Sequence, residues 1–86
     1  MNSYRVALTT SAEKELKWLP AKLITRILGR LEKLASNPRP PGCKKLVGGD
    51  KQWRIRLGDW RVVYEIDDKA KTVDVTRIAH RRDVYE

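Results

Sequence analysis

After Asn37 the spacing of the apolar residues changes from the helical period of the preceding segment to alternation along the second half of the chain. Two kinds of side chain dominate residues 44–62, apolar (Trp53, Ile55, Leu57, Trp60 and Val62) and cationic (Lys44, Lys45, Lys51, Arg54, Arg56 and Arg61). Alternation at a period of two sends successive side chains to opposite faces of a sheet. The second half therefore predicts a small sheet with one apolar face and one rigid cationic face.

The first half predicts one strand and two helices. Alternation over Ser3–Leu8 is typical of a short strand. Thr10 and Glu13 have capping-box spacing, which predicts that a helix begins there. Pro20 interrupts this helix and suits the first turn of a second one, which should end at Asn37 because a residue before proline disfavours the helical conformation. The expected apolar stripes are Ala12, Leu16 and Leu19, then Leu23, Ile24, Ile27, Leu28, Leu31, Leu34 and Ala35.

Four more strands are predicted, at residues 45–47, 53–57, 60–66 and 73–78, separated by turn signals rich in Gly and Asp. Helices followed by a run of strands indicate an α+β domain, in which an N-terminal strand and a two-helix hairpin accompany a small antiparallel β-sheet and the helices cover one face. The sequence shows no internal repeat, linker or low-complexity tract, so residues 1–86 should form a single domain.

A two-residue turn at Gly58 and Asp59 would place Arg56 directly opposite Arg61. The same register pairs Leu57 with Trp60, Ile55 with Val62, and Trp53 with Tyr64. Like charges that face each other destabilise a hairpin. Either an anion binds between the two guanidinium groups, or both side chains are splayed and solvated.

The net charge of +8, from 19 Lys and Arg against 11 Asp and Glu, favours an anionic partner: nucleic acid, an anionic membrane surface or an acidic protein. The single cysteine, Cys43, has no partner for an internal disulfide and is expected to be neither metal ligand nor nucleophile. No apolar run approaches the roughly 20 residues of a membrane span, and the N-terminus lacks the apolar segment of a signal peptide. We therefore expect a cytoplasmic protein with no membrane association.

Four motifs in order give the chain a family resemblance: K-K-L, W-R-I-R-L, W-R-V-V-Y and H-R-R-D-V-Y. Together with the order of elements, they resemble the RelE branch of the RelE/ParE toxin superfamily over essentially the whole chain. The resemblance implies a toxin of a type II toxin-antitoxin module, partnered by a cognate antitoxin. RelE toxins act at the ribosomal A site, where they cleave mRNA by attack of a 2′-hydroxyl on the adjacent phosphate, without a metal or a small-molecule cofactor.

The resemblance also implies the site. The catalytic residues would be Arg54, Arg56, Arg61, His80, Arg81 and Tyr85, and the expected RNA-binding residues are Lys44, Lys45 and Lys51. The strand positions that are lysine in the best-known RelE toxin are arginine here, and arginine does not deprotonate, so neither Arg54 nor Arg56 can be a general base. The chain also stops one residue after Tyr85.

The required chemistry divides these residues by role. Guanidinium groups supply permanent charge and bidentate donors for a phosphate in its transition state. His80 is the only histidine, the side-chain type that titrates near neutral pH, and either it or Tyr85 would act as general acid or base. Tyr85 could instead stack on a base. Trp53, Trp60 and Tyr64 lie on the apolar face and are expected in the core.

Two alternatives remain at this point. ParE toxins share the fold but inhibit DNA gyrase without cleaving RNA, and such a toxin would not need the set Arg54, Arg56, Arg61, Arg81 and Tyr85. A basic nucleic-acid-binding module without toxicity would remain if the short C-terminus had abolished catalysis.

Overall fold

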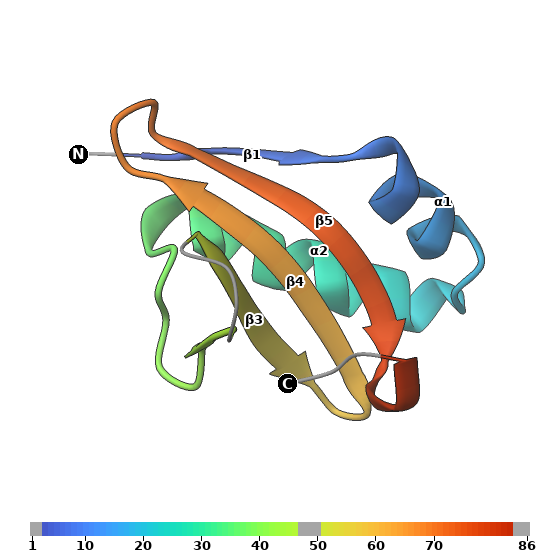
Figure 1. Cartoon of the computed structure of the whole chain (residues 1–86). Helices are drawn as coiled ribbons and strands as arrows, with labels where there is room; N and C mark the ends of the chain where they lie inside the picture. The colour runs from blue at the N-terminus through green and yellow to red at the C-terminus, as the bar shows by residue number, and fades with distance from the viewer. Residues whose placement is uncertain (1–2, 47–50, 84–86) are drawn as a thin grey trace.

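The computed structural model describes residues 3–46 and 51–83 and shows two helices against a five-stranded sheet (Figure 1). The elements are β1 (Arg5–Leu8), α1 (Thr10–Lys17), α2 (Ala21–Ser36), β2 (Lys44–Lys45), β3 (Gln52–Leu57), β4 (Trp60–Asp67), β5 (Thr72–His80) and the 3₁₀ turn η1 (Arg81–Asp83). Strand, helical hairpin and meander follow one another as the sequence predicts, and the α+β class is confirmed. No helix within the described ranges is both long and apolar enough to cross a membrane.

The strand order in the sheet is β1-β5-β4-β3-β2. Strands β2 to β5 form the expected antiparallel meander, but β1 runs parallel to β5, so the sheet is mixed instead of antiparallel throughout. A parallel neighbour requires a long crossover, which the helical hairpin and the meander together supply. The first and last strands of the chain therefore lie side by side.

Both helices begin and end close to the predicted residues, with one correction. The N-cap of α1 is Thr9, whose Oγ1 accepts a hydrogen bond from the Ala12 amide at 3.2 Å, and Thr10 is already the first helical residue. Thr9 is still in the extended conformation that follows β1, which is the conformation an N-cap requires. Pro20 directly precedes α2, and Asn37 directly follows it.

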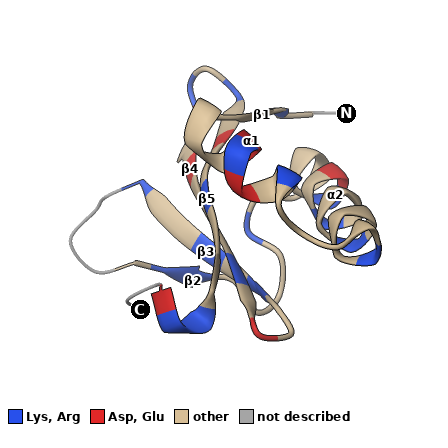
Figure 2. Cartoon of the chain, turned by 90° about the vertical axis from the view of Figure 1, so that its right-hand side faces the viewer, with Lys and Arg blue, Asp and Glu red and all other residues tan. Residues whose placement is uncertain are grey.

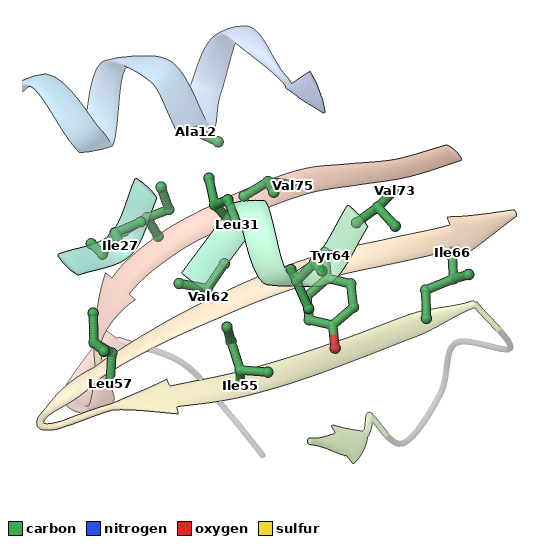
Figure 3. Close-up of a cluster of buried hydrophobic side chains, with 12 residues drawn as sticks. Ala12, Ile27, Leu31, Ile55, Leu57, Val62, Tyr64, Ile66, Val73 and Val75 are labelled. Carbon is green, nitrogen blue, oxygen red and sulfur yellow. The ribbon is translucent and has the colours of Figure 1, made fainter. Parts of the chain in front are cut away.

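The core lies between the helices and the apolar face of the meander (Figure 3). Ile27 and Leu31 of α2 meet Val62 and Tyr64 of β4, and Tyr64 is fully buried. Its hydroxyl donates to the Pro38 carbonyl oxygen at 2.7 Å, and burial raises the pKa of the phenol. The prediction that Tyr64 belongs to the core is confirmed, and so is the complete register of the β3–β4 hairpin.

A bulge in β5 decides which of its side chains face the core. The pairing with β4 shifts between Val63, opposite Arg77, and Tyr64, opposite Val75, so one extra residue lies on β5. Because of this shift, Val73, Val75 and Ile78 all reach the core. The end of β5 is also tied to α1, because a Glu15 carboxylate oxygen accepts from the Ile78 amide at 2.8 Å.

Asp68 connects the turn between β4 and β5 to other segments of the chain through hydrogen bonds. Its carboxylate accepts from the Tyr4 hydroxyl at 2.6 Å and from both terminal nitrogens of Arg39 at 3.2 and 2.9 Å. The hydrogen bonds from Arg39 and then from Tyr4 lower the pKa of Asp68 from 3.8 to about 2. This carboxylate joins three segments that are distant in sequence.

The lowered pKa predicts a pH-dependent contribution to stability. A carboxyl whose pKa is lower in the folded state stabilises the fold above its unfolded pKa, and that contribution is lost as the pH falls through the folded value. We therefore expect Asp68→Asn to lower the melting temperature at pH 6, with a difference from wild type that shrinks between about pH 4 and about pH 2. Thermal unfolding at several pH values measures this, and a difference that does not depend on pH would contradict it.

Candidate functional site

The turn between β3 and β4 brings several of the predicted site residues together. Gly58 has φ of +60°, the left-handed value that glycine adopts at the first central position of a tight hairpin turn. The Arg61 side chain folds back onto this turn, where Nη1 donates to the carbonyl oxygens of Gly58 and Trp60, each at 3.0 Å. The turn therefore fixes the direction of the Arg61 guanidinium group.

Arg81 is held against the same turn. Its backbone amide donates to the Asp59 carbonyl oxygen at 2.7 Å, and its Nε lies 3.8 Å from an Asp59 carboxylate oxygen. The ion pair is well exposed on both sides and adds little stability. The backbone hydrogen bond is therefore what places η1, and Arg81 with it, beside the turn.

His80 ends β5 directly opposite Trp60, and their rings meet edge to face with centroids 5.5 Å apart. The Arg82 amide donates to His80 Nδ1 at 3.3 Å. An imidazole whose Nδ1 accepts a hydrogen bond carries its proton on Nε2 when it is neutral. Strand alternation puts His80 on the Trp60 side of the sheet and Arg61 on the other side.

Figure 2 shows the helices on one side of the sheet, and strand alternation puts Arg54 and Arg56 of β3 and Arg61 of β4 on the other face. Arg56 is exposed, but Arg54 is only 3% and Arg61 only 6% exposed, so only part of the predicted cationic face is open to solvent. Both buried arginines lie on inner strands of the sheet.

The Arg56–Arg61 pair was expected either to hold an anion between its guanidinium groups or to be splayed and solvated, and neither description fits it completely. The two residues are directly opposite, as predicted, but only Arg56 is exposed to solvent, whereas Arg61 is buried against the turn carbonyls. The partial negative charge of those carbonyl oxygens offsets the repulsion between the guanidinium groups. Small apolar residues complete this face, where Val63 and Ala79 pack with Leu46.

The three lysines that the sequence groups together are separated by the structure. Lys44 pairs with Arg54 and shares its face, whereas Lys45 pairs with Trp53 on the helix side. Lys45 and Lys51 line a hollow of about 430 Å³ together with Arg39, whose guanidinium carbon lies 5.1 Å from the centroid of the Trp53 ring. This hollow is at the opposite end of β3 from the turn that holds Arg61 and Arg81.

The remaining candidates add little to the site. Tyr85 lies outside the described residues. Trp53 packs against the core, as expected, and Trp60 is half-buried at the sheet end. Among residues 3–46 and 51–83, no group of three or more His, Cys, Asp or Glu side chains could hold a metal ion.

Sequence reasoning missed Asp59, which positions Arg81, although its place in a two-residue turn beside two arginine-bearing strands was visible.

The geometry makes Arg61 a structural as well as a candidate functional residue. We expect Arg61→Ala to lower stability by about 1–3 kcal/mol, because two turn carbonyls lose a charged donor inside a buried site. Arg56→Ala, at an exposed position, should change stability by less than about 0.5 kcal/mol. Chemical denaturation of the two variants measures this difference. Equal stabilities would show that the bonds from Arg61 to the turn contribute nothing.

A model of one protein family matches residues 6–85, described as the ParE toxin of the type II toxin-antitoxin system parDE. Toxin RelG from Mycobacterium tuberculosis is 31% identical to the chain, over 95% of each sequence. The chain belongs to the RelE/ParE toxin superfamily. The toxin therefore carries the fold of that superfamily.

Solved structures agree with this assignment. The RelE toxin in an archaeal RelE–RelB complex from Pyrococcus horikoshii superposes with a TM-score of 0.84 at 30% identity, covering 95% of this chain and 99% of that one. The toxin of the intact RelBE toxin-antitoxin complex of E. coli superposes with a TM-score of 0.81 at 24% identity, covering 91% and 96%. The second likeness supports the fold alone.

Proposed function

We propose that this toxin is a ribosome-dependent mRNA endonuclease of RelE type, which acts in the cytoplasm and is neutralised by a cognate antitoxin. The observation that carries the proposal is the gathering of Arg56, Arg61 and Arg81 at the β3–β4 turn, with His80 at the same end of the sheet. A protein that only binds another protein has no need of three arginines gathered at one turn. A site that cleaves a phosphodiester does.

In the proposed reaction, the 2′-hydroxyl of the mRNA attacks the adjacent phosphorus, and the bond to the departing 5′-oxygen breaks. The products are a 2′,3′-cyclic phosphate and a 5′-hydroxyl. Negative charge on the phosphate oxygens increases in the transition state, and exposed Arg56 is the residue placed to bind them. Arg61 is already fixed by the turn, so its charge needs little reorganisation as the reaction proceeds.

Proton transfer to or from the RNA requires a group other than arginine, because arginine stays charged. With Nδ1 accepting from the Arg82 amide, neutral His80 carries its proton on Nε2 and can donate a hydrogen bond to the departing 5′-oxygen. To receive the proton of the 2′-hydroxyl at Nε2, the ring would change tautomer and give up the bond from Arg82. Tyr85 is the second candidate for this work. Arg81, the next residue after His80, would add charge there, whereas Lys44, Lys45 and Lys51 would hold the RNA backbone farther along the sheet.

The proposed antitoxin follows from the relatives and from the charge. The P. horikoshii and E. coli relatives were solved as complexes with RelB. A toxin with a charge of +8 suits an acidic segment that covers the face bearing Arg56 and keeps RNA away.

The proposal is tested by expressing the toxin in cells without an antitoxin. Primer extension on a translated message should show cuts in phase with codons, and a message whose start codon is removed should stay intact. A supercoiling assay with purified protein and DNA gyrase runs in parallel, because the matching family model bears the ParE name. Intact mRNA together with blocked supercoiling would replace the proposal with gyrase inhibition.

A further inference from the structure

The most exposed large apolar side chain of the described residues is far from the arginine-bearing face. Trp18 is 88% exposed at the C-terminal end of α1, in the connection that leads to α2. The ring borders a hollow of about 480 Å³ that Lys14 and Lys17 also line. Lys14 is one helical turn from Trp18, so a cation stands on the same side of α1 as the ring.

The exposed side of α2 is strongly basic. Lys22, Arg26 and Arg30 are exposed and follow one another every four residues, which places them in one row about 6 Å apart along the helix axis. The two helices carry six basic residues (Lys14, Lys17, Lys22, Arg26, Arg30 and Lys33) and three acidic ones (Glu13, Glu15 and Glu32). Glu15 is already bound to β5.

The basic row and the three strand arginines lie on opposite sides of the sheet. The helices cover one face of the sheet (Figure 2), and strand alternation puts Arg54, Arg56 and Arg61 on the other. The row reaches the end of β3, where Arg26 and Arg30 line a hollow together with Leu57. The proposed catalytic role therefore leaves Trp18 and the row on α2 without a function.

We propose that Trp18, Lys14, Lys17 and the row Lys22–Arg26–Arg30 form a second RNA-binding surface, on which an unpaired base stacks on the Trp18 ring and phosphates contact the row. An aromatic side chain beside a track of cations is the arrangement that binds single-stranded RNA without sequence preference. Membranes and partner helices need a continuous apolar face, whereas here one ring stands among cations.

The inference rests on the proposed function, since a second RNA surface would let the toxin hold structured RNA of the ribosome with its helices while the other face acts on mRNA. It requires no cleavage, however, and can be tested by binding alone. The domain measures 33 × 27 × 25 Å, so two RNA segments on opposite sides of it would not overlap.

The test measures binding of a fluorescein-labelled oligoadenylate of about 12 nucleotides, made with 2′-O-methyl riboses so that it cannot be cut. Fluorescence anisotropy with purified toxin should show binding that is about 5- to 150-fold weaker for Trp18→Ala, the loss expected for one stacked base. Trp18→Phe, which keeps an aromatic ring, should recover most of the affinity. Leu28→Ala is the matched control, because Leu28 is exposed on α2 outside the basic row.

A charge variant adds an independent readout. Lys22→Ala/Arg26→Ala, which removes two cations of the row, should reduce the slope of log affinity against log salt by about 1.4, the value for two phosphate contacts on a single strand. Equal affinities of wild type and Trp18→Ala, or no binding by the wild type, would overturn the inference. It would also be overturned if labelled poly-L-glutamate bound as tightly as the RNA with the same dependence on Trp18, because the surface would then fit an acidic protein.

These outcomes are distinguishable from failure of the proposed function. The binding assay contains no ribosome and no cleavable bond, so loss of RNA affinity in Trp18→Ala supports the second surface whether or not the wild type cuts mRNA in cells.

Discussion

Arg56→Ala is expected to slow mRNA cleavage by about 10²-fold or more, the effect of removing one donor to a transition-state charge. Arg56 is exposed on β3 and lies directly opposite buried Arg61, so it is the residue of this pair that an incoming phosphate can reach. Single-turnover cleavage of mRNA on programmed ribosomes measures the rate. The cleavage rate of Arg56→Lys should fall between those of the wild type and Arg56→Ala, because lysine keeps the charge but loses the bidentate geometry.

The matched control is Arg5→Ala, which removes an exposed strand arginine from β1, at the far edge of the sheet. It changes the net charge equally and should leave the cleavage rate close to that of the wild type. A rate for Arg56→Ala within a factor of about three of the control, in a folded protein, would remove Arg56 from the site. The double variant with Arg61→Ala should be less than additive if both side chains act on one phosphate.

Removal of residues 80–86 is expected to abolish cleavage while the fold remains. The truncation deletes His80, Arg81 and Tyr85, and with them both candidates for proton transfer. The pairing of β5 with β4 as far as Ala79, opposite Arg61, stays intact, and every residue of the main core cluster is upstream. The truncated chain should therefore unfold cooperatively with a moderately lower melting temperature.

Two single variants separate the contributions to this effect. His80→Gln keeps a hydrogen-bonding side chain without a group that titrates near neutral pH, and Tyr85→Phe keeps the ring without the hydroxyl. If His80 transfers the proton, His80→Gln should reduce the rate and flatten its dependence on pH, whereas Tyr85→Phe should leave that pH profile unchanged. A truncated protein that still cuts mRNA would show that neither residue is required.

The parts of the fold that follow local rules could be predicted from the sequence. The helical stripes and the prolines at 20 and 38 define α1 and α2, and the turn at Gly58 and Asp59 determines the complete β3–β4 register. The position of β1 beside β5 could not be predicted in this way, because the partner of an isolated strand depends on contacts between the two ends of the chain.

The spacing of apolar residues in the sequence does indicate the bulge in β5. Core residues follow one another at Val73, Val75 and Ile78, and the step of three in place of two indicates an extra residue. The burial of Arg54 and Arg61 had no such signal. Alternation assigns a side chain to a face, but how deeply that face is covered depends on strand order and on the direction a long side chain takes.

The sequence therefore indicated which residue types gather near the turn better than it indicated how they are arranged. Arg56, Arg61 and Arg81 do gather at one end of the sheet, but Lys45 and Lys51 lie at the other end. The residue that places Arg81, Asp59, contributes chiefly its backbone carbonyl, which no side-chain pattern reveals.

The most direct test of the proposed activity is cleavage of a defined mRNA by purified toxin, with and without ribosomes that hold a codon in the A site. We expect a cut within that codon only when ribosomes are present, with a 5′-hydroxyl and a 2′,3′-cyclic phosphate at the break, and a rate that falls at least about 10²-fold in Arg56→Ala. An uncut message in the presence of ribosomes, or equal cutting by wild type and Arg56→Ala, would contradict it.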